Sequence, residues 1–335
     1  MNINALAQQI ADYFKKNPQQ MTDTPSSTPA PAPATATPAP ATTPSSTPAP
    51  APKKDKKKAT VAEATVAPQG GGGAAGWKFF KAGDAALGAS GKGATPVNKA
   101  GKLAYEALYK KGKIHGGGSS LNLDIIPKEF FPAEQLRFSF KIMYDDNFPW
   151  DPPREKVGGK IIGFFIGKGS ASGGNYTKTA ASFRLTWSFN GGVGPYLYPQ
   201  VKNPFSKGGS GKPDIPKEDL DQSQEVWDVS YVAAGMHVFF PKKKEDPNAW
   251  ELKFKKGQWN DVEMFIKLNT PGKKDGLLSL TVNGVTKSLK TVRFRNDNAK
   301  IERVEIATFF GGGTQDYAPP ADTKAWYADF GFSKA

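Results

Sequence analysis

Apolar and polar residues alternate one by one in short runs through much of the chain. Gly, Pro, Asn and Asp bound these runs, which is the pattern of strands separated by turns. Strands are predicted at residues 137–144, 160–166, 182–189, 261–269, 277–283, 303–309 and 326–332. Because no long helical period interrupts them, we predict an all-β sandwich, and the usual large form of such a sandwich is the jelly roll.

Two short segments have the spacing of helices instead. Residues 3–16 place apolar side chains at near-helical intervals among polar ones, so an amphipathic helix is predicted within residues 1–20. A helix this short is marginal in water, so it either docks on a partner or frays. A second short helix is expected within residues 100–112.

Low-complexity sequence follows the first helix. The string TPSSTPAPAP occurs twice between residues 24 and 52, and Pro-Ala alternation favours an extended, semi-rigid spacer because it removes backbone donors. The predicted organisation has four parts, which are a short helix at 1–20, a disordered Pro/Ala/Lys-rich linker at 21–75, an N-terminal extension of the folded part at 76–119, and a jelly-roll domain at 120–335. We expect a chain that begins near Trp77 to keep the activity of the full protein.

The charge of the chain narrows the choice of partners. The formal net charge is +14. Residues 1–75 hold seven basic and four acidic residues, so a net charge of +11 belongs to the remainder. A folded part this basic favours an anionic partner, which is nucleic acid, an anionic membrane or an acidic polysaccharide. No nucleic-acid recognition module can be identified, so we expect no specific nucleic-acid partner.

Several kinds of chemistry are excluded by what the sequence lacks. It contains no cysteine, which excludes disulfides, thiolate metal sites and cysteine nucleophiles. Two distant histidines give a catalytic metal little to bind, so no metal or cofactor is predicted, although carboxylates leave a structural Ca²⁺ site open. Neither a signal peptide nor an apolar run of about 18–20 residues is found, so we expect a soluble protein without a transmembrane segment.

The predicted strand at 182–189 carries an arginine in the middle of its polar face. Side chains alternate across a strand, so Ser182 and Arg184 share one face while the apolar residues between them face the core. An Asn-Gly-Gly turn then leads to a segment in which Tyr196 and Tyr198 share a face. If the two segments pair as a hairpin, one surface displays all four side chains. The alternative is that Arg184 is an exposed strand charge and the tyrosines are ordinary strand residues.

This set of side chains suits β-elimination on a uronic acid. The reaction needs a cation to neutralise the C5 carboxylate, a base to take the C5 proton and an acid to protonate the leaving glycosidic oxygen. Arginine binds carboxylates through two parallel hydrogen bonds, and tyrosine or lysine can act as base or acid when its surroundings shift its pKa. Lys160 stands beside glycines, which allow a backbone or a ligand to approach closely.

Several runs of sequence together resemble a known family. They are GGKIIGFFIG, SFRLTWSFNGGVGPYLYP, FKKGQWNDVEMFIKLNTPGKKDGLLSLTVNGV, and ATFFGGG followed by WYADFGF. This ordered series resembles polysaccharide lyase family 14, and in particular the glucuronan or alginate lyases that chlorella viruses carry to digest the algal cell wall. The resemblance implies that the active-site lysine is Lys160, that the Ser-x-Arg pair is Ser182 and Arg184, and that the Tyr-x-Tyr pair is Tyr196 and Tyr198.

These residues have hypothetical roles in catalysis. We expect Arg184, helped by Ser182, to neutralise the carboxylate. Tyr196 or Tyr198 would take and return the proton, and Lys160 would either lower the pKa of that tyrosine or act as the base itself.

Three further residues are weaker candidates for substrate binding. Lys267 and Asn269 face away from the apolar residues of their predicted strand, so they either line the same groove or face solvent. His237 is the third, and any histidine base would have to be His237 or His115. A lone histidine on a strand is more often structural.

The predicted function is therefore that of a polysaccharide lyase, a carbon–oxygen lyase that cleaves glucuronan-like or alginate-like glycans of an algal cell wall. The alternative is a non-catalytic jelly roll, either a glycan-binding module or a structural protein of a virion. A glycosidase would need paired carboxylates, and the acidic cluster at residues 218–221 lies in a loop-like segment. The N-terminal arm would contact other virion components. The protein is expected in the virion, or in the host cytoplasm before release, and would act on the extracellular wall.

Overall fold

The structure is a computed structural model, and it describes residues 76–151, 156–173, 175–201, 228–232, 235–240, 251–312 and 314–334. The helix predicted within 1–20, the linker predicted at 21–75 and the acidic cluster at 218–221 lie outside these residues. Within the described ranges, none of the helices has the length and apolar character needed to cross a bilayer.

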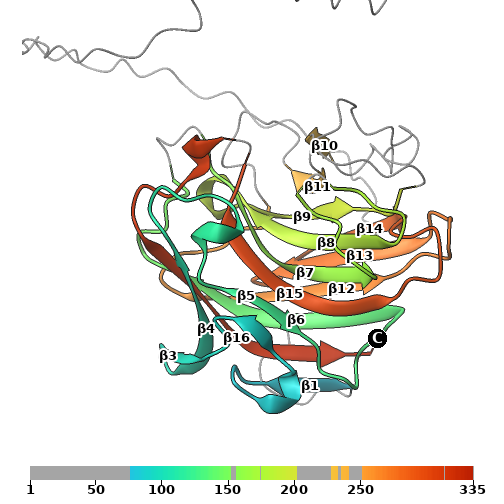
Figure 1. Ribbon diagram of the computed structural model, residues 1–335, viewed down its shortest axis with the longest axis horizontal. Helices are drawn as coiled ribbons and strands as arrows, with labels where there is room; N and C mark the ends of the chain where they lie inside the picture. Colours follow the sequence, from blue (N-terminus) through green and yellow to red (C-terminus); the bar gives the residue numbers. More distant parts are fainter. Residues whose placement is uncertain are drawn as a thin grey trace, which may run out of the picture. The chain divides into compact units, whose positions relative to one another are not determined.

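Two antiparallel eight-stranded sheets make up the fold (Figure 1). In the first, called sheet A here, the strand order is β14-β13-β12-β6-β16-β4-β3, and β1 also pairs with β16. The strands of sheet A are β1 (Trp77–Phe80), β3 (Val97–Lys99), β4 (Lys102–Tyr109), β6 (Gln135–Tyr144), β12 (Trp259–Lys267), β13 (Gly276–Val282), β14 (Val285–Val292) and β16 (Thr323–Ser333).

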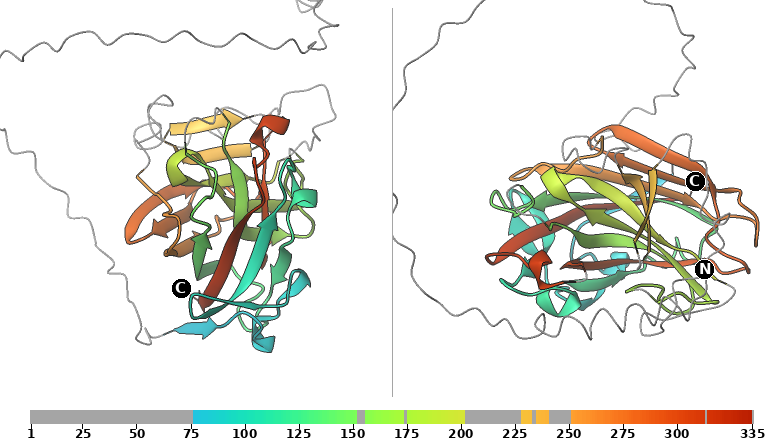
Figure 2. Two further views of the ribbon diagram at one scale, coloured as in Figure 1. Left: turned by 90° about the vertical axis from the view of Figure 1, so that its left-hand side faces the viewer. Right: turned by 90° about the horizontal axis from the view of Figure 1, so that it is seen from above.

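In the second sheet, called sheet B here, the strand order is β10-β11-β9-β8-β7-β15-β5-β2. The pair β10 and β11 forms one edge of sheet B, far from β1, which lies beside the end of β16 (Figures 1 and 2). The strands of sheet B are β2 (Ser90–Lys92), β5 (Asn122–Ile125), β7 (Gly159–Gly167), β8 (Ala180–Trp187), β9 (Val193–Tyr198), β10 (Asp228–Val232), β11 (Gly235–Phe240) and β15 (Ile301–Phe310).

Short 3-10 helices occur in the connections. They are η2 (Ala85–Leu87), η3 (Gly116–Gly118), η4 (Phe189–Gly191) and η5 (Gln315–Tyr317).

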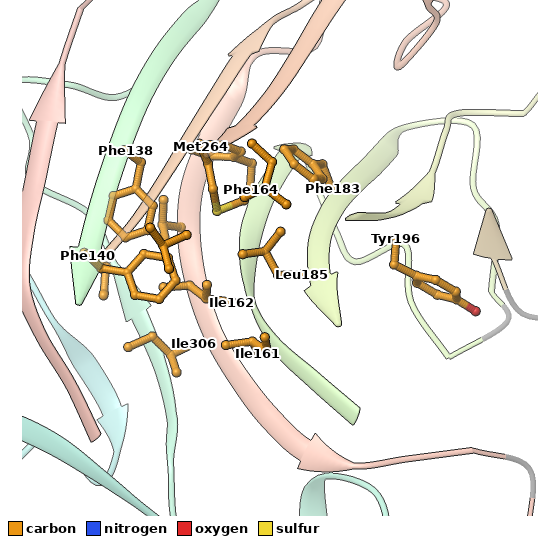
Figure 3. Packing of buried hydrophobic residues seen from close by; sticks show 14 of the residues in the cluster. Phe138, Phe140, Ile161, Ile162, Phe164, Phe183, Leu185, Tyr196, Met264 and Ile306 are labelled. Atoms are coloured by element: carbon orange, nitrogen blue, oxygen red, sulfur yellow. The ribbon is translucent and has the colours of Figure 1, made fainter. Parts of the chain in front are cut away.

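The core lies between the two sheets because their strands bury alternate side chains. Along β6, burial alternates residue by residue over all ten positions. Phe138 and Phe140 of this strand meet Phe164 and Phe183 of sheet B, and Figure 3 shows these rings on the core side of β8, with Tyr196 on its other side. The predicted β-sandwich is therefore confirmed.

The prediction of a short helix within residues 100–112 is wrong. Residues 102–109 form β4, in which Tyr105, Ala107 and Tyr109 are buried at every second position. The tyrosines and leucines of this segment also fit a helical period, but β16 offers a complete row of backbone partners, and this tertiary pairing decides the structure. The predicted extension at 76–119 thus contributes β1, β2, β3 and β4 to the two sheets.

Candidate active site

The hairpin of β8 and β9 brings four of the predicted residues onto one face of sheet B. Ser182 is the backbone partner of Tyr198, and Arg184 is the partner of Tyr196. Directly opposed residues of an antiparallel pair lie on the same face, so the four side chains are neighbours on the face turned away from sheet A. The turn between the strands places Asn190 at φ 52°, a left-handed conformation that Asn tolerates better than most residues. The predicted hairpin is confirmed.

Lys160 joins this face from β7. Its Nζ lies 4.7 Å from the centre of the Tyr196 ring, 5.5 Å from that of Tyr198 and 5.7 Å from that of Phe309. A lysine held among three rings interacts with their negatively charged faces, which fixes the position of its ammonium group. The tyrosine hydroxyls are 3.4 Å apart, with Tyr198 as the donor. Lys160, Tyr196 and Tyr198 thus form one cluster.

The glycine next to Arg184 is required by close packing. Gly163 of β7 is the backbone partner of Arg184, and a Cβ atom at Gly163 would lie 2.6 Å from the Cα of Arg184. Only glycine allows β7 and β8 to approach this closely. The close backbone approach expected from the glycines beside Lys160 is present.

Arg184 is the most unusual charge of the candidate site. Its residue surface is 3% exposed, so the alternative of an exposed strand charge is wrong. One terminal nitrogen donates to the carbonyl oxygen of Ala307 at 2.9 Å, whereas Nε has no hydrogen-bond partner among the described residues. Burial lowers the pKa of Arg184, and the nearby carboxylate of Glu305 opposes this effect. A buried guanidinium with an unused donor favours the binding of an anion.

Two of the predicted residues are covered by the connection between β7 and β8. The hydroxyl of Ser182 donates to the carbonyl oxygen of Ala171 at 2.6 Å, and Ser182 is completely buried. The ring of Tyr176 packs 5.1 Å from that of Tyr198, which is also completely buried. Ser182 therefore holds this connection in place, and its hydroxyl proton is already used there.

Burial raises the pKa of Tyr196 well above its usual value. The neighbouring hydroxyl of Tyr198 raises it further, by its charge and by its hydrogen bond, whereas Arg184 lowers it. Desolvation is the largest of these causes, because burial removes the water that would stabilise an ionised phenol. Tyr196 therefore carries its proton at neutral pH and in moderately alkaline solution.

The sequence-based prediction missed an aromatic residue that links the members of this site. Phe309 of β15 lies 5.8 Å from the guanidinium carbon of Arg184, in addition to its contact with Lys160. The ring of His115 lies 6.3 Å from that of Phe309, and the backbone of His115 has φ 63° and ψ −177°, which is unusual for any residue except glycine. The adjacent aromatic pair in the run ATFFGGG was the available signal for Phe309.

Two of the three weaker candidates, Lys267 and Asn269, do not join the site. Lys267 ends β12 in sheet A, and its exposed side chain faces away from the core, on the side of the molecule opposite to Lys160. Asn269 is completely buried. Its amide accepts from the backbone nitrogens of Phe294 and Arg295 and donates to two carbonyl oxygens. The prediction that Lys267 and Asn269 line the same groove is therefore wrong, because Lys267 lies on the outer face of the other sheet and the buried amide of Asn269 is used by backbone groups.

For His237 the structure describes the backbone position, where it is the partner of Tyr196 in the pairing of β11 with β9. Groups of His, Asp and Glu side chains that could hold a metal ion are absent from the described residues.

Comparison with known proteins gives a family match first. The model of the family described as Polysaccharide lyase 14 matches residues 248–330, which confirms the resemblance seen in the sequence. The matched region covers β12 to most of β16, so it holds Phe309 but none of the five residues Lys160, Ser182, Arg184, Tyr196 and Tyr198.

Individual relatives extend the likeness over more of the chain. A protein of Paramecium bursaria Chlorella virus 1 named Exolysin is 26% identical over 213 residues, which are 62% of this chain and 30% of the relative. The matched region thus spans less than a third of that relative's length.

Among solved structures, alginate lyase vAL-1 from Chlorella virus matches with a TM-score of 0.57 and 24% identity, over 76% of this chain and 95% of that one. The marine PL-14 alginate lyase from Aplysia kurodai matches with a TM-score of 0.54 and 20% identity, over 72% and 86% of the two chains. These likenesses establish the fold as that of the jelly-roll lyases.

Proposed function

We propose that this protein is a polysaccharide lyase that cleaves a uronic-acid-containing glycan by β-elimination. The observation that carries the proposal is Arg184, a buried cation with an unused donor that lies among two phenols and a lysine. A carboxylate is the ligand that satisfies such a group best, because it accepts from two guanidinium nitrogens at once. The family match and the viral relative support the same reaction class.

In the proposed reaction a proton leaves C5, a double bond forms between C4 and C5, and the bond from C4 to the glycosidic oxygen breaks. Arg184 neutralises the C5 carboxylate and so makes the C5 proton more acidic. The released oxygen takes a proton from the enzyme, and the proton from C5 remains on the base.

The raised pKa of Tyr196 favours it as the acid. Its phenol is protonated before the reaction and can donate to the leaving oxygen, whereas a phenolate base at this position would be strongly disfavoured. We assign the base to Lys160, whose side chain is half-buried, in preference to Tyr198, which is completely buried. Ser182 then contributes by holding the connection from β7 to β8 through Ala171.

The proposed substrate is a glucuronan-like or alginate-like polymer. The solved relatives named above are alginate lyases, and the net charge of +14 favours an anionic polymer. By analogy with the viral relative, we propose that the protein acts on an algal cell wall, that it travels with the virion, and that residues 1–20 contact other virion components. Neither a metal nor a cofactor takes part in the proposed mechanism.

The experiment is to follow the ultraviolet absorbance of the unsaturated product with polyglucuronate and alginate as separate substrates. We expect an increase on at least one polymer, and we expect it to disappear in the Lys160→Ala variant. Polymer binding is measured in parallel by calorimetry. Binding to wild type without any increase in absorbance on either polymer would mean that the jelly roll binds glycans without cutting them.

A further inference from the structure

The strand that carries Lys160 breaks its own alternation to expose this side chain. Ile162 and Phe164 of β7 are buried in the core between the sheets. In a regular strand every second residue shares a face, so Lys160 would also point into the core. Instead its Nζ lies among the rings of Tyr196, Tyr198 and Phe309 on the outer face. Some feature of the backbone must therefore reverse the alternation between Lys160 and Ile162.

Two adjacent irregularities in the sheet account for this reversal. Against β8, the register of β7 shifts between Lys160 and Gly163, and β7 has one residue more than β8 across this interval. Against β7, the register of β15 shifts between Ile306 and Phe309, and here β15 has the extra residue. Ile161 and Ile162 are accordingly both buried, although they are consecutive. Extra residues of this kind bend a strand and redirect its side chains.

Thr308 lies at the second irregularity and is bonded to the backbone of Lys160. The threonine is 1% exposed, and its Oγ1 donates to the carbonyl oxygen of Lys160 at 3.0 Å. The hydroxyl of Tyr327 donates to the same Oγ1 at 2.9 Å, and the hydroxyl of Tyr109 lies 2.5 Å from it. Because the single hydroxyl proton of Thr308 is used on Lys160, Tyr109 must be a donor as well, which fills both lone pairs of Oγ1.

We infer that Thr308 is a positioning residue for Lys160. It ties the irregular backbone of β7 to that of β15 from the core side, and Tyr109 and Tyr327 fix its orientation from strands β4 and β16 of sheet A. Hydrogen bonds in the core between the sheets thus determine where the amine of Lys160 lies on the outer face of sheet B. This role rests on the proposed function, since it assigns Thr308 to the placement of the proposed base.

The kinetic test compares Thr308→Val, which keeps the shape but removes the hydroxyl, with Thr308→Ser, which keeps the hydroxyl. We expect Thr308→Val to lower kcat by about 10- to 100-fold with KM within about twofold of wild type, because a small misplacement of a catalytic group is costly. Thr308→Ser should restore most of kcat. Thr323→Val is the matched control, because Thr323 is also buried but its hydroxyl has no partner among the described residues. An equal fall in kcat for both valine variants would overturn the inference.

A spectroscopic test reads the position of Lys160 without turnover. The lysines of the full chain are reductively methylated with ¹³C-formaldehyde, and the Lys160 signal is identified by its loss in Lys160→Arg. Ring currents from the surrounding aromatic rings should shift this signal in wild type, Thr308→Ser and Thr323→Val, and the shift should diminish in Thr308→Val. An unchanged signal in a folded Thr308→Val would contradict the inference even if wild type proves to be inactive, so failure of the proposed function is recognised separately.

If Thr308→Val does not fold, Tyr327→Phe provides the second variant. It removes one donor to the same Oγ1. It should cause a smaller fall in kcat and a smaller change in the Lys160 signal, and no change in either would count against the inference.

Discussion

Each sheet carries an arginine in the middle of a strand, next to a phenylalanine ring. The two arginines differ in burial and in ion pairing. In sheet A, Arg137 stands 4.7 Å from the centre of the Phe265 ring, its side chain is 35% exposed, and it donates to Glu263 at 2.7 Å. In sheet B, Arg184 stands 5.8 Å from the centre of the Phe309 ring and is 3% exposed. Ion pairs of Arg184 are absent among the described residues.

The difference separates a charge that serves solubility from one that serves binding. The outer face of sheet A pairs its charges across neighbouring strands, as in Arg137 with Glu263, Lys141 with Asp261 and Lys324 with Glu106. Each such exposed pair stabilises the fold by only about 0–1 kcal/mol. The outer face of sheet B instead buries Arg184 without an ion pair among the described residues, because the nearby carboxylate of Glu305 pairs with Arg303. Such burial costs stability unless a ligand supplies a carboxylate. An unpaired buried charge is thus a better indication of a site than the number of charges.

The largest effect is expected from removing each arginine in turn. Arg184→Ala should lower turnover of the preferred polyuronate by about 10³-fold, because a positioned charge that stabilises the developing anion is lost. Arg137→Ala should leave turnover within about twofold, as for any exposed ion pair. Initial rates from the absorbance of the unsaturated product measure both. Equal losses in the two variants would remove the distinction between the faces.

The second effect concerns the proposed acid. Tyr196→Phe removes the phenolic proton while keeping the ring, so turnover should fall by about 10²- to 10³-fold. Because its pKa is raised, Tyr196 stays protonated in alkaline solution, and ionisation of this phenol should not cause any loss of rate below about pH 10. Tyr105→Phe is the control in sheet A, since the partner of the Tyr105 hydroxyl among the described residues is the backbone nitrogen of Gly83, from which it accepts. A rate for Tyr196→Phe close to that of Tyr105→Phe would exclude Tyr196 as the acid.

A third effect is on stability and involves Lys267, the last residue of β12, and Asn269, which follows the end of this strand. Asn269→Ala leaves the backbone nitrogens of Phe294 and Arg295 without their acceptor, so the free energy of unfolding should fall by about 2–3 kcal/mol. Lys267→Ala changes an exposed side chain and should alter it by less than about 0.5 kcal/mol. Urea unfolding measures both variants. A loss of turnover in folded Lys267→Ala would mean that substrate also reaches sheet A.

The smallest effect is a change in stability at high pH, and it involves Tyr109 in the core between the two sheets. Burial raises the pKa of Tyr109 from 10.0 to about 12. Below pH 10 Tyr109 keeps its proton in both the folded and the unfolded state, so this residue adds no pH dependence to the stability. Between pH 10 and 12 the unfolded state releases this proton and the folded state keeps it, so Tyr109 alone should lower the stability by about 1.4 kcal/mol per pH unit.

The Tyr109→Phe variant tests this explanation, because it lacks the ionisable group. Between pH 10 and 12 its unfolding free energy should decline less steeply with pH than that of wild type. The slopes should differ by about 1.4 kcal/mol per pH unit, which corresponds to one proton. Identical slopes would contradict the assigned cause.

The strands were predictable where one face is buried and the other faces solvent, because apolar and polar residues then alternate along the sequence. The predicted strand at 137–144 lies inside β6, and the one at 326–332 lies inside β16. The strand β4 was mistaken for a helix because its aromatic and aliphatic residues satisfy both periods, and only pairing with β16 distinguishes them.

The candidate site was predictable in its membership but not in its geometry. Ser182, Arg184, Tyr196 and Tyr198 share a face because a hairpin has a simple register. The sequence could not reveal that the hydroxyl of Ser182 is used by Ala171, since this bond depends on how a long connection folds back. Lys160 was harder still. Regular alternation would place its side chain in the core with that of Ile162. Its side chain lies on the outer face because the sheet has two irregularities, which the sequence pattern does not show.

The position of β16 has a consequence for how the protein folds. Residues 323–333 lie between β4 and β6 and pair with both, and β1 pairs with the end of the same strand. Until a ribosome has released these residues, β4 and β6 have no shared neighbour, and their edges are open to other chains. Contacts between residues this far apart in sequence form slowly. We therefore expect a nascent chain that depends on chaperones until β16 is made, and then closes sheet A in a single late step.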